Sequence, residues 1–364
     1  GRKDLCFYLG PDKMDHVREC THVGLILNTN GNLKQHIDNA MGKARRAINA
    51  GVGLLSSDSF EYNPLTASIL YWSISVPSMT YGMDILPLKQ CDYDTLELTH
   101  RQIAKRIQQL PCNVHNEASL AQLGWSRIRA VIDTKKLMFL WCILNLPTTC
   151  VYKMIFIIEF FRWKSISEHS KLYSNYSVIN AVLNLVTRYN LWRYIDEYFL
   201  NYDLMPKCAW KRIVKARIMQ YEEDRWHLLC NISNRLSVYR TIQVTIKPCV
   251  WWRICQSNCK YIGMCRDMVK LLTGAFPLNY DTICPLCGMT NETTRHFLLD
   301  CLELHESRSD LLAVLSDRIF DGYNMVEKME VLLGKNEALD YRMYVKIMLS
   351  VKHMLKTRAA AIAL

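Results

Sequence analysis

Three cysteines and one histidine in the last quarter of the chain impose the strongest constraint on its fold. They follow the spacing Cys-x2-Cys-x8-His-x4-Cys, at Cys284, Cys287, His296 and Cys301. Three thiolates and one imidazole fill all four positions around a tetrahedral Zn²⁺, which is typical of a structural rather than a catalytic site. We therefore expect a structural Zn²⁺ here. The alternative is a set of buried thiols with no shared metal ion.

The residues around this quartet favour a compact metal-binding loop. Cys284 and Cys287 fit a tight turn, and Gly288 after them supplies backbone freedom. His296 and Cys301 are separated by about one and a half turns of a helix, which Thr293 or Thr294 can cap. Three thiolates outweigh one Zn²⁺ in charge, so any affinity for anions must come from neighbouring side chains.

Composition places the chain in a broad class. Its 364 residues are half hydrophobic, which is ample for more than one buried core. The fifteen cysteines show no even framework and no secretory leader precedes them, so we expect an intracellular protein, nuclear or cytoplasmic. No apolar run is long enough to span a bilayer, so we expect no membrane segment. Because the first residue is not Met, we expect a piece of a longer product.

Positive charge is concentrated in one segment. The net charge is +11, and residues 207–270 alone carry thirteen Lys or Arg against four acids, with Trp and Tyr interleaved. This mixture suits a polyanion whose bases can stack on aromatic rings. The alternative is a solvated helical surface over an aromatic core, and we expect most of the rings to lie in that core.

Hydrophobic periodicity predicts a mainly α-helical chain with few short strands. Helices are expected at about 33–50, 93–110 and 207–229, with three more in the tail at about 305–320, 325–334 and 339–360. Strands are expected at 22–27 and within 235–255. Two of these helices carry a group of basic residues. The helix at 93–110 has Arg101, Lys105 and Arg106 on its exposed side, and the helix at 207–229 has Lys207, Lys211 and Lys215 at i, i+4 and i+8.

Several short segments occur in an order that resembles a known family. They are His22-Val23-Gly24-Leu25, Leu70-Tyr71 followed by Pro77-Ser78-Met79-Thr80-Tyr81-Gly82, Leu110-Pro111, and His296-Phe297-Leu298-Leu299-Asp300-Cys301 ahead of Arg308. In this order they resemble the C-terminal half of the reverse transcriptase of non-LTR (LINE-type) retrotransposons. The resemblance covers nearly the whole chain, and the zinc region is its most specific part.

The resemblance implies a division into five segments. These are a remnant of the palm end (1–32), a thumb-like helical domain (33–115), an apolar helical connection (116–204) with a linker near 164–177, a basic aromatic linker (205–275), and a CCHC zinc-binding region with C-terminal helices (276–364).

The resemblance implies nucleic-acid binding without catalysis. The family's polymerase holds two Mg²⁺ ions with clustered carboxylates in an aromatic-Ala-Asp-Asp turn, and this sequence contains no Asp-Asp pair. The implied partners are RNA or DNA and the upstream polymerase domains of the same polyprotein. The implied contacts are Arg101, Lys105 and Arg106 on the thumb side, and Lys207, Lys211, Lys215, Arg253, Lys260, Arg266 and Arg295 on the linker and zinc side.

Two other function classes compete with this one. A zinc-stapled helical module that binds another protein remains open as the alternative. An independent enzyme is disfavoured, because the sequence contains no G-x-S-x-G, no H-E-x-x-H and no Walker loop. The acidic run Glu222-Glu223-Asp224 is interpreted as a solvated helix face.

Overall fold

The computed structural model of the chain describes residues 6–55, 62–166, 177–201, 203–276, 278, 283–316, 322–335 and 339–363. Within these residues the fold is mainly α-helical, as predicted, with two small two-stranded sheets. None of the helices described is both long and apolar enough to cross a bilayer. Most of the linker predicted near 164–177 lies outside the described residues.

Two antiparallel hairpins begin the chain: β1 (Phe7–Leu9) with β2 (Asp12–Met14), and β3 (Glu19–His22) with β4 (Leu25–Asn28). The prediction of one strand over 22–27 was therefore wrong, because the chain reverses at Val23 and Gly24. These two residues have φ angles of 47° and 78°. Positive φ at both central positions is the type I′ geometry, whose twist matches that of the flanking strands.

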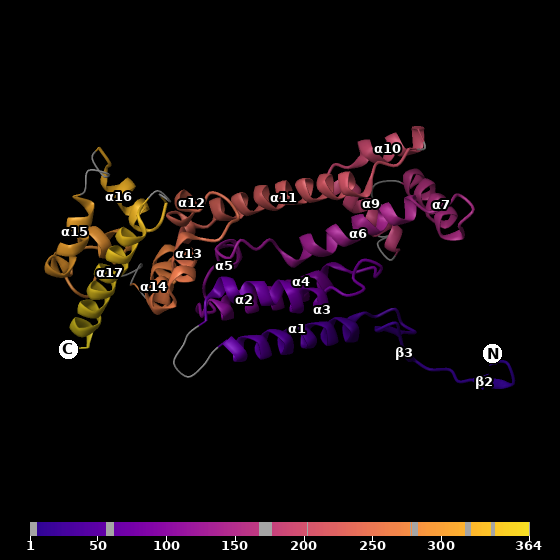
Figure 1. Cartoon of the computed structure of the whole chain (residues 1–364), viewed down its shortest axis with the longest axis horizontal. Coiled ribbons are helices and arrows are strands. Elements are labelled where there is room, and N and C mark those ends of the chain that lie inside the picture. Colours follow the sequence, from indigo (N-terminus) through magenta and orange to yellow (C-terminus); the bar gives the residue numbers. More distant parts are fainter. Residues whose placement is uncertain are drawn as a thin grey trace.

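Four long helices form the frame of the molecule. Figure 1 shows these helices one above another, each running roughly along the long axis. In order they are α1 (Lys34–Leu55), α4 (Gln90–Ile107), α6 (Ile128–Leu144) and α11 (Lys207–Ile232). α6 and α11 run antiparallel, since Arg127 contacts Glu222 at one end while Trp210 donates to the carbonyl of Leu137 towards the other. Shorter elements fill the space around α4: α2 (Pro64–Leu70), η1 (Tyr71–Ser75), α3 (Val76–Met79) and α5 (Asn116–Ala121).

The remaining helices lie at the two ends of this frame (Figure 1). At one end are α7 (Val151–Ser165), α9 (Val178–Arg188) and α10 (Trp192–Asn201). At the other are α12 (Tyr239–Ile242), α13 (Val250–Ser257), α14 (Ile262–Leu272), α15 (Ser309–Leu315), α16 (Met325–Leu332) and α17 (Tyr341–Ile362), the last three matching the helices predicted for the tail.

The strands predicted within 235–255 were wrong. Short helices occupy much of this segment, and Tyr239, Trp251 and Trp252 are completely buried on them. Residues with high β propensity reflect a fit to a half-buried pleated surface, and a tertiary site that buries them on a helix overrides this tendency. As expected, most rings of the basic segment are core: Trp210 and Trp226 are buried as well.

The buried hydrophobic residues form two clusters. The first joins residues between 25 and 132 with residues between 226 and 354, and the second joins residues between 130 and 218. α6 and α11 contribute to both. The clusters thus group the chain differently from the five segments implied by the resemblance, since the N-terminal helices share one core with the C-terminal region.

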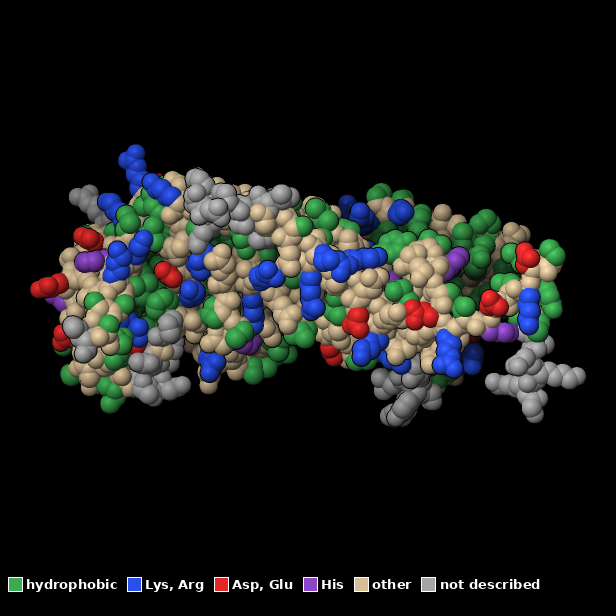
Figure 2. All heavy atoms as spheres, turned by 90° about the horizontal axis from the view of Figure 1, so that it is seen from below, with side chains coloured by type: hydrophobic (Ala, Val, Ile, Leu, Met, Phe, Trp, Pro, Cys, Tyr) green, Lys and Arg blue, Asp and Glu red, His purple; other side chains and the backbone are tan. Residues whose placement is uncertain are grey.

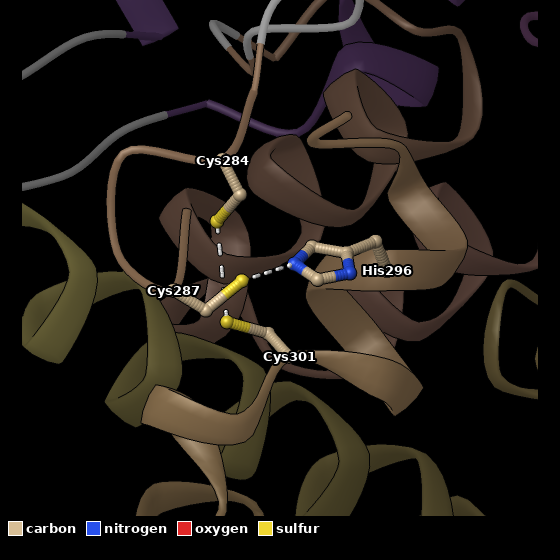
Figure 3. Close-up of side chains that lie close together, drawn as sticks. All are labelled: Cys284, Cys287, His296 and Cys301. Carbon is tan, nitrogen blue, oxygen red and sulfur yellow. Dashed lines mark hydrogen bonds between the residues drawn. The ribbon is translucent and has the colours of Figure 1, made fainter. Parts of the chain in front are cut away.

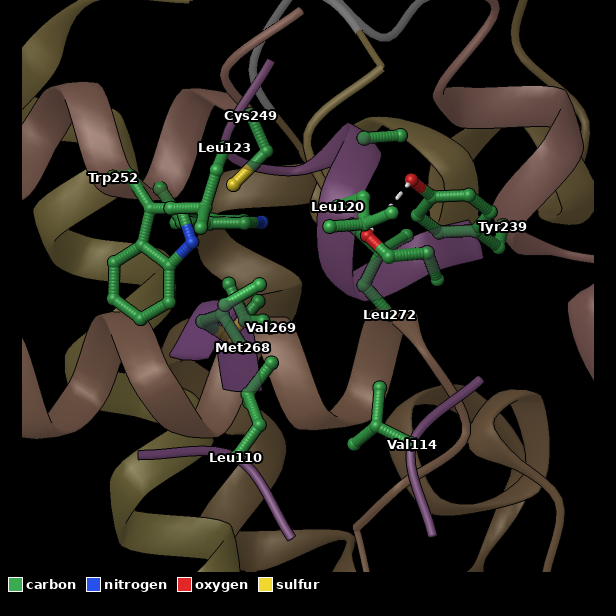
Figure 4. Close-up of a cluster of buried hydrophobic side chains, with 14 of the residues drawn as sticks. Leu110, Val114, Leu120, Leu123, Tyr239, Cys249, Trp252, Met268, Val269 and Leu272 are labelled. Carbon is green, nitrogen blue, oxygen red and sulfur yellow. Dashed lines mark hydrogen bonds between the residues drawn. The ribbon is translucent and has the colours of Figure 1, made fainter. Parts of the chain in front are cut away.

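One part of the first cluster attaches the C-terminal region to the long helices. Figure 4 shows Leu110 and Val114, which follow α4, in one buried cluster with Met268 and Leu272 of α14 and Tyr239 of α12. The indole of Trp252 donates a hydrogen bond of 2.9 Å to the side-chain oxygen of Gln108. Apolar contact and a satisfied buried polar group therefore act together at this junction.

Buried ion pairs connect α11 to the helices beneath it. Glu222 receives two hydrogen bonds from Arg127, of 2.9 and 2.6 Å, and Glu117 receives two from Arg225, of 3.1 and 2.8 Å. Glu222 is completely buried, so its interpretation as part of a solvated face was wrong. The pairing arginine lies 95 residues away in sequence, and nothing local to Glu222 reveals it.

Candidate metal centre and basic surfaces

The four predicted ligands converge on one point. Their ligand atoms all lie within 4.8 Å of one another. The sulfurs of Cys284 and Cys301 are 4.0 Å apart, and the sulfur of Cys287 is 3.3 Å from Nε2 of His296 (Figure 3). Tetrahedral Zn–S bonds place two sulfurs about 3.8 Å apart. The quartet could therefore hold a metal ion, and no further group of three such side chains was found among the described residues.

Local backbone hydrogen bonds build the first half of this site. The amide of Gly288 donates to the carbonyl of Cys284 at 2.9 Å, and the amide of Cys284 donates to the carbonyl of Thr290 at 2.7 Å. Gly288 has a φ of 64°, in the left-handed region that favours glycine. The resulting turn brings the sulfurs of Cys284 and Cys287 to the same side of the loop (Figure 3).

Two threonines position the histidine. Thr293 accepts a hydrogen bond of 3.1 Å from the amide of His296, so it is Thr293, of the two predicted candidates, that caps this turn. Nδ1 of His296 lies 2.9 Å from the hydroxyl of Thr290. In the tautomer with Nδ1–H donating to Thr290, the lone pair of Nε2 faces the sulfurs, which is the usual arrangement around a ligating histidine.

A buried arginine holds the segment that carries the last two ligands. Arg308 donates to the carbonyls of Leu298 and Cys301, both at 2.8 Å, and to that of Phe297 at 3.3 Å. These carbonyls end the π-helical turn η4 (His296–Asp300). The guanidinium thus satisfies backbone oxygens that the turn leaves unpaired, and it places a positive charge beside the cysteines.

Burial and the neighbouring sulfurs of Cys284 and Cys287 raise the pKa of the Cys301 thiol to about 12. Three thiolates packed this closely repel one another. The form in which all three cysteines are ionised therefore requires a cation between them. The donor set of three sulfurs and one imidazole is the kind that soft or borderline metals prefer.

Sequence reasoning missed the residues that support this quartet. The sequence pattern assigned no role to Thr290, and Glu292 pairs with Arg358, which is 66 residues away. Thr290 could have been suspected from its position between the two ligand pairs. The Glu292–Arg358 pair has no local signal, because its partners meet only after the C-terminal helix has packed.

The three basic residues predicted on α4 do not form one exposed group. Arg106 is exposed, whereas Arg101 and Lys105 are half-buried. The ammonium of Lys105 donates to the carbonyl of Cys112 at 2.7 Å, and burial lowers its pKa. Arg101 interacts electrostatically with the buried carboxylates of Glu97 and Glu117. The expectation of a common exposed face was wrong because helix α5 and its preceding loop cover part of it.

The basic residues predicted on α11 are all exposed. The ammonium of Lys207 lies 5.6 Å from the ring centroid of Trp141. Within the described part of the chain, no carboxylate pairs with Lys211, Arg212 or Lys215. From Lys207 to Tyr221 the helix carries five basic residues and no acidic one. This is the most strongly positive helical surface in the segment predicted to be basic.

The other four predicted contacts lie towards the metal-binding end. Arg253 and Lys260 are exposed, and Arg266 is half-buried. Arg295 is half-exposed, but its Nε lies 3.2 Å from a carboxylate oxygen of Asp300. The ammonium of Lys260 lies 4.8 Å from the ring centroid of Tyr261.

The predicted basic residues do not gather in one patch. The Lys207 end of α11 lies beside α10, at the opposite end of the molecule from α15 and α17 (Figure 1). Viewed from the α1 side, Lys and Arg side chains are spread along the length of the surface with acidic side chains among them (Figure 2). A polyanion that touched both Lys207 and the metal-binding end would have to run along the whole of α11, about 39 Å.

No protein-family model, curated protein or solved structure matches this chain.

Proposed function

We propose that this chain binds nucleic acid, with a structural Zn²⁺ in the Cys284, Cys287, His296 and Cys301 quartet, and that it is the C-terminal part of a non-LTR retrotransposon reverse transcriptase. The observation that carries the proposal is the first half of α11. It presents exposed Lys211, Arg212 and Lys215, which no carboxylate neutralises among the described residues. The ligand quartet and the ordered segments that resemble the family support it.

Phosphate contact is the chemistry that such a helix offers. Lys207, Lys211 and Lys215 span about 12 Å along one side of α11, which is comparable with the spacing of several successive phosphates. Each phosphate that a lysine or arginine neutralises releases counterions, so binding of this kind weakens steeply with salt.

The metal's proposed role is structural. When bound, Zn²⁺ would join the turn at Cys284 to the turn at His296, and four protein ligands leave it no open position for a substrate or a reactive water. Thr290 and Arg308 hold these two turns in place from outside. The proposal is therefore of binding rather than catalysis.

The salt dependence of binding tests this function. We expect RNA and DNA affinity to fall steeply between about 50 and 200 mM salt. Replacing Lys211, Arg212 and Lys215 together by Gln should reduce the slope of log affinity against log salt by about 2 to 3. A control variant with Lys346, Lys352 and Lys356 of α17 replaced by Gln removes the same charge from another exposed helix, and its slope should change less. Binding that is absent or insensitive to salt contradicts the proposal.

One observation favours the alternative, a module that binds another protein. α7 buries Phe156, Phe160 and Trp163 on one side. Its other side exposes Val151, Tyr152, Ile155, Ile158 and Phe161, each by 48 to 74%. A helix that is apolar on both sides is typical of a partner interface. Under this alternative, nucleic acid does not bind even at about 50 mM salt, and an Ile155→Asp, Ile158→Asp variant loses a protein partner that the α11 variant keeps.

A further inference from the structure

A pocket of about 730 Å³ lies between the helical body and the metal-binding region. Its volume is in the range of sites that hold small ligands. The lining comes from four separate segments: the loop after α4, the turn after α11, the end of α14, and the loop that leads to His296. Its lining includes Asn113, Asn234, Arg235, Ser237, Leu271, Leu272, Phe276 and Thr293.

The floor of the pocket is apolar and well packed. Leu271 and Leu272 are buried, and Leu272 belongs to the cluster that joins Val114 and Tyr239 (Figure 4). The half-buried ring of Phe276 stands beside them, on a turn in which the amides of Ala275 and Phe276 donate to the carbonyl of Lys270 at 2.8 and 3.1 Å. A flat apolar ligand would therefore meet a preformed surface.

The rim of the pocket is polar and positively charged. Among the described residues, the lining includes the guanidinium groups of Arg235 and Arg295 and no carboxylate, and Arg295 pairs with Asp300 outside the lining. Arg235 is exposed, as are Asn113, Asn234, Ser237 and Thr293. Amide and hydroxyl groups donate and accept hydrogen bonds as base edges require, and arginine pairs with phosphate. An apolar floor below a cationic polar rim thus matches a nucleotide, with its base inside and its phosphate outside.

We propose that this pocket receives unpaired nucleotides from a single-stranded part of the bound nucleic acid. The inference rests on the proposed function. A base held within a stacked double helix cannot reach a closed floor, whereas an unstacked base can enter it and contact Phe276 and the amide groups at the rim. The charge of the rim favours a nucleic acid over an apolar peptide.

The pocket is linked to the metal centre through one of its walls. Thr293, Thr294 and Arg295 line the pocket and directly precede the ligand His296. The hydroxyl of Thr293 accepts a hydrogen bond from the amide of His296. A bound metal ion would therefore fix the position of this wall, and removal of the metal should weaken the capture of single-stranded nucleotides more than contact with a duplex along α11.

The experiment compares two oligonucleotides bound to the full chain loaded with Zn²⁺. One is a blunt duplex, and the other is the same duplex with a short overhang that carries 2-aminopurine. We expect tighter binding of the overhang and a change in 2-aminopurine fluorescence. The double variant Asn234→Ala, Arg235→Gln should lose about tenfold in overhang affinity, as for one lost hydrogen-bonded base contact. Its blunt-duplex affinity should match that of Arg240→Gln, a variant with the same charge loss outside the pocket.

A second variant tests the same site by filling it. Ser237→Trp places a ring in the pocket from an exposed position, and it should abolish the fluorescence change while leaving duplex binding intact. Three results overturn the inference. In the first, overhang and blunt duplex bind equally well to the unmodified chain. In the second, the pocket variants lose affinity for both oligonucleotides alike. In the third, the overhang is displaced by an acidic peptide that does not displace the duplex. Each of these three results is compatible with the proposed function. If neither oligonucleotide binds, the result contradicts the proposed function as well.

Discussion

Arg358, near the end of α17, forms a two-point ion pair with Glu292 in the loop between the two pairs of candidate metal ligands. Nη2 of Arg358 lies 2.7 Å from Oε2 of Glu292, and its Nε contacts Oε1. The two side chains are 10% and 1% exposed. Because α17 also packs against α14 and α15, this pair ties the metal-binding loop to the C-terminal helix.

Removal of this arginine should destabilise the metal-binding region strongly. Arg358→Met removes the guanidinium that pairs with the buried carboxylate of Glu292, and loss of one member of a buried pair costs about 3 to 5 kcal/mol in comparable cases. Lys356→Met, on the same helix but exposed, should change the free energy of unfolding by less than about 0.5 kcal/mol. Denaturant unfolding of the Zn²⁺-loaded chain measures both. Equal stabilities of the two variants would show that the pair does not hold the loop.

The quartet should bind one divalent metal ion through three thiolates. Titration with Co²⁺ should give the intense sulfur-to-metal absorption of a tetrahedral thiolate site, and Zn²⁺ should displace it. Cys301→Ala should abolish this spectrum, whereas Cys259→Ala should preserve it, since Cys259 is exposed and lies outside the quartet. A normal spectrum from Cys301→Ala would rule out the assigned ligand set.

The two acidic neighbours Glu222 and Asp224 should behave very differently on substitution. Glu222→Gln weakens a buried pair with Arg127 and should destabilise the fold by about 3 kcal/mol. Asp224→Asn alters an exposed side chain and should cost less than about 0.5 kcal/mol. Thermal or denaturant unfolding distinguishes them. A small effect at both positions would show that Glu222 behaves as an exposed residue, as the sequence suggested.

Glu97 should make stability depend on pH. Burial raises the pKa of its carboxyl from 4.5 to about 7, against the opposing effect of the Arg129 amide and of Arg101. The folded state then holds the proton more tightly than the unfolded state, so this contribution to stability is complete below about pH 4.5 and is lost as the pH rises through about 7.

The variant Glu97→Gln isolates this effect. Relative to it, the unmodified chain should lose on the order of 3 kcal/mol of unfolding free energy between about pH 4.5 and 7, and little beyond. Asp94→Asn, an exposed acid on the same helix, serves as the control and should show no such difference. Parallel stability curves for Glu97→Gln and the unmodified chain across this pH range would contradict the raised pKa.

Features that depend on neighbouring residues were predicted well from the sequence. The ligand quartet is the clearest case, because Cys284 and Cys287 share one turn, and Thr293 caps the segment that begins at His296. The helices also followed from hydrophobic periodicity, since the buried stripe of α11 at Trp210, Val214 and Ile218 repeats at helical spacing. Short-range geometry fixes such features whatever the rest of the chain does.

Features that depend on distant partners were not predicted. Glu222 and Arg101 are charged residues on amphipathic helices, and charge alone assigned them to the surface. Each interacts with a side chain from another element: Glu222 with Arg127 at the start of α6, and Arg101 with Glu117 of α5. The residues at 235–255 likewise form helices because their aromatic side chains find buried sites on α12 and α13.

The sequence by itself determined that this chain is mainly helical, which four side chains could share a metal ion, and where its positive charge is concentrated. The tertiary structure decided which of those charges remain available to a partner and which are used inside the fold. It also created the pocket beside the metal-binding loop, whose walls come from segments far apart in the chain. The physical reason is range: periodicity and turn geometry act over a few residues, whereas burial and charge pairing depend on which surfaces meet.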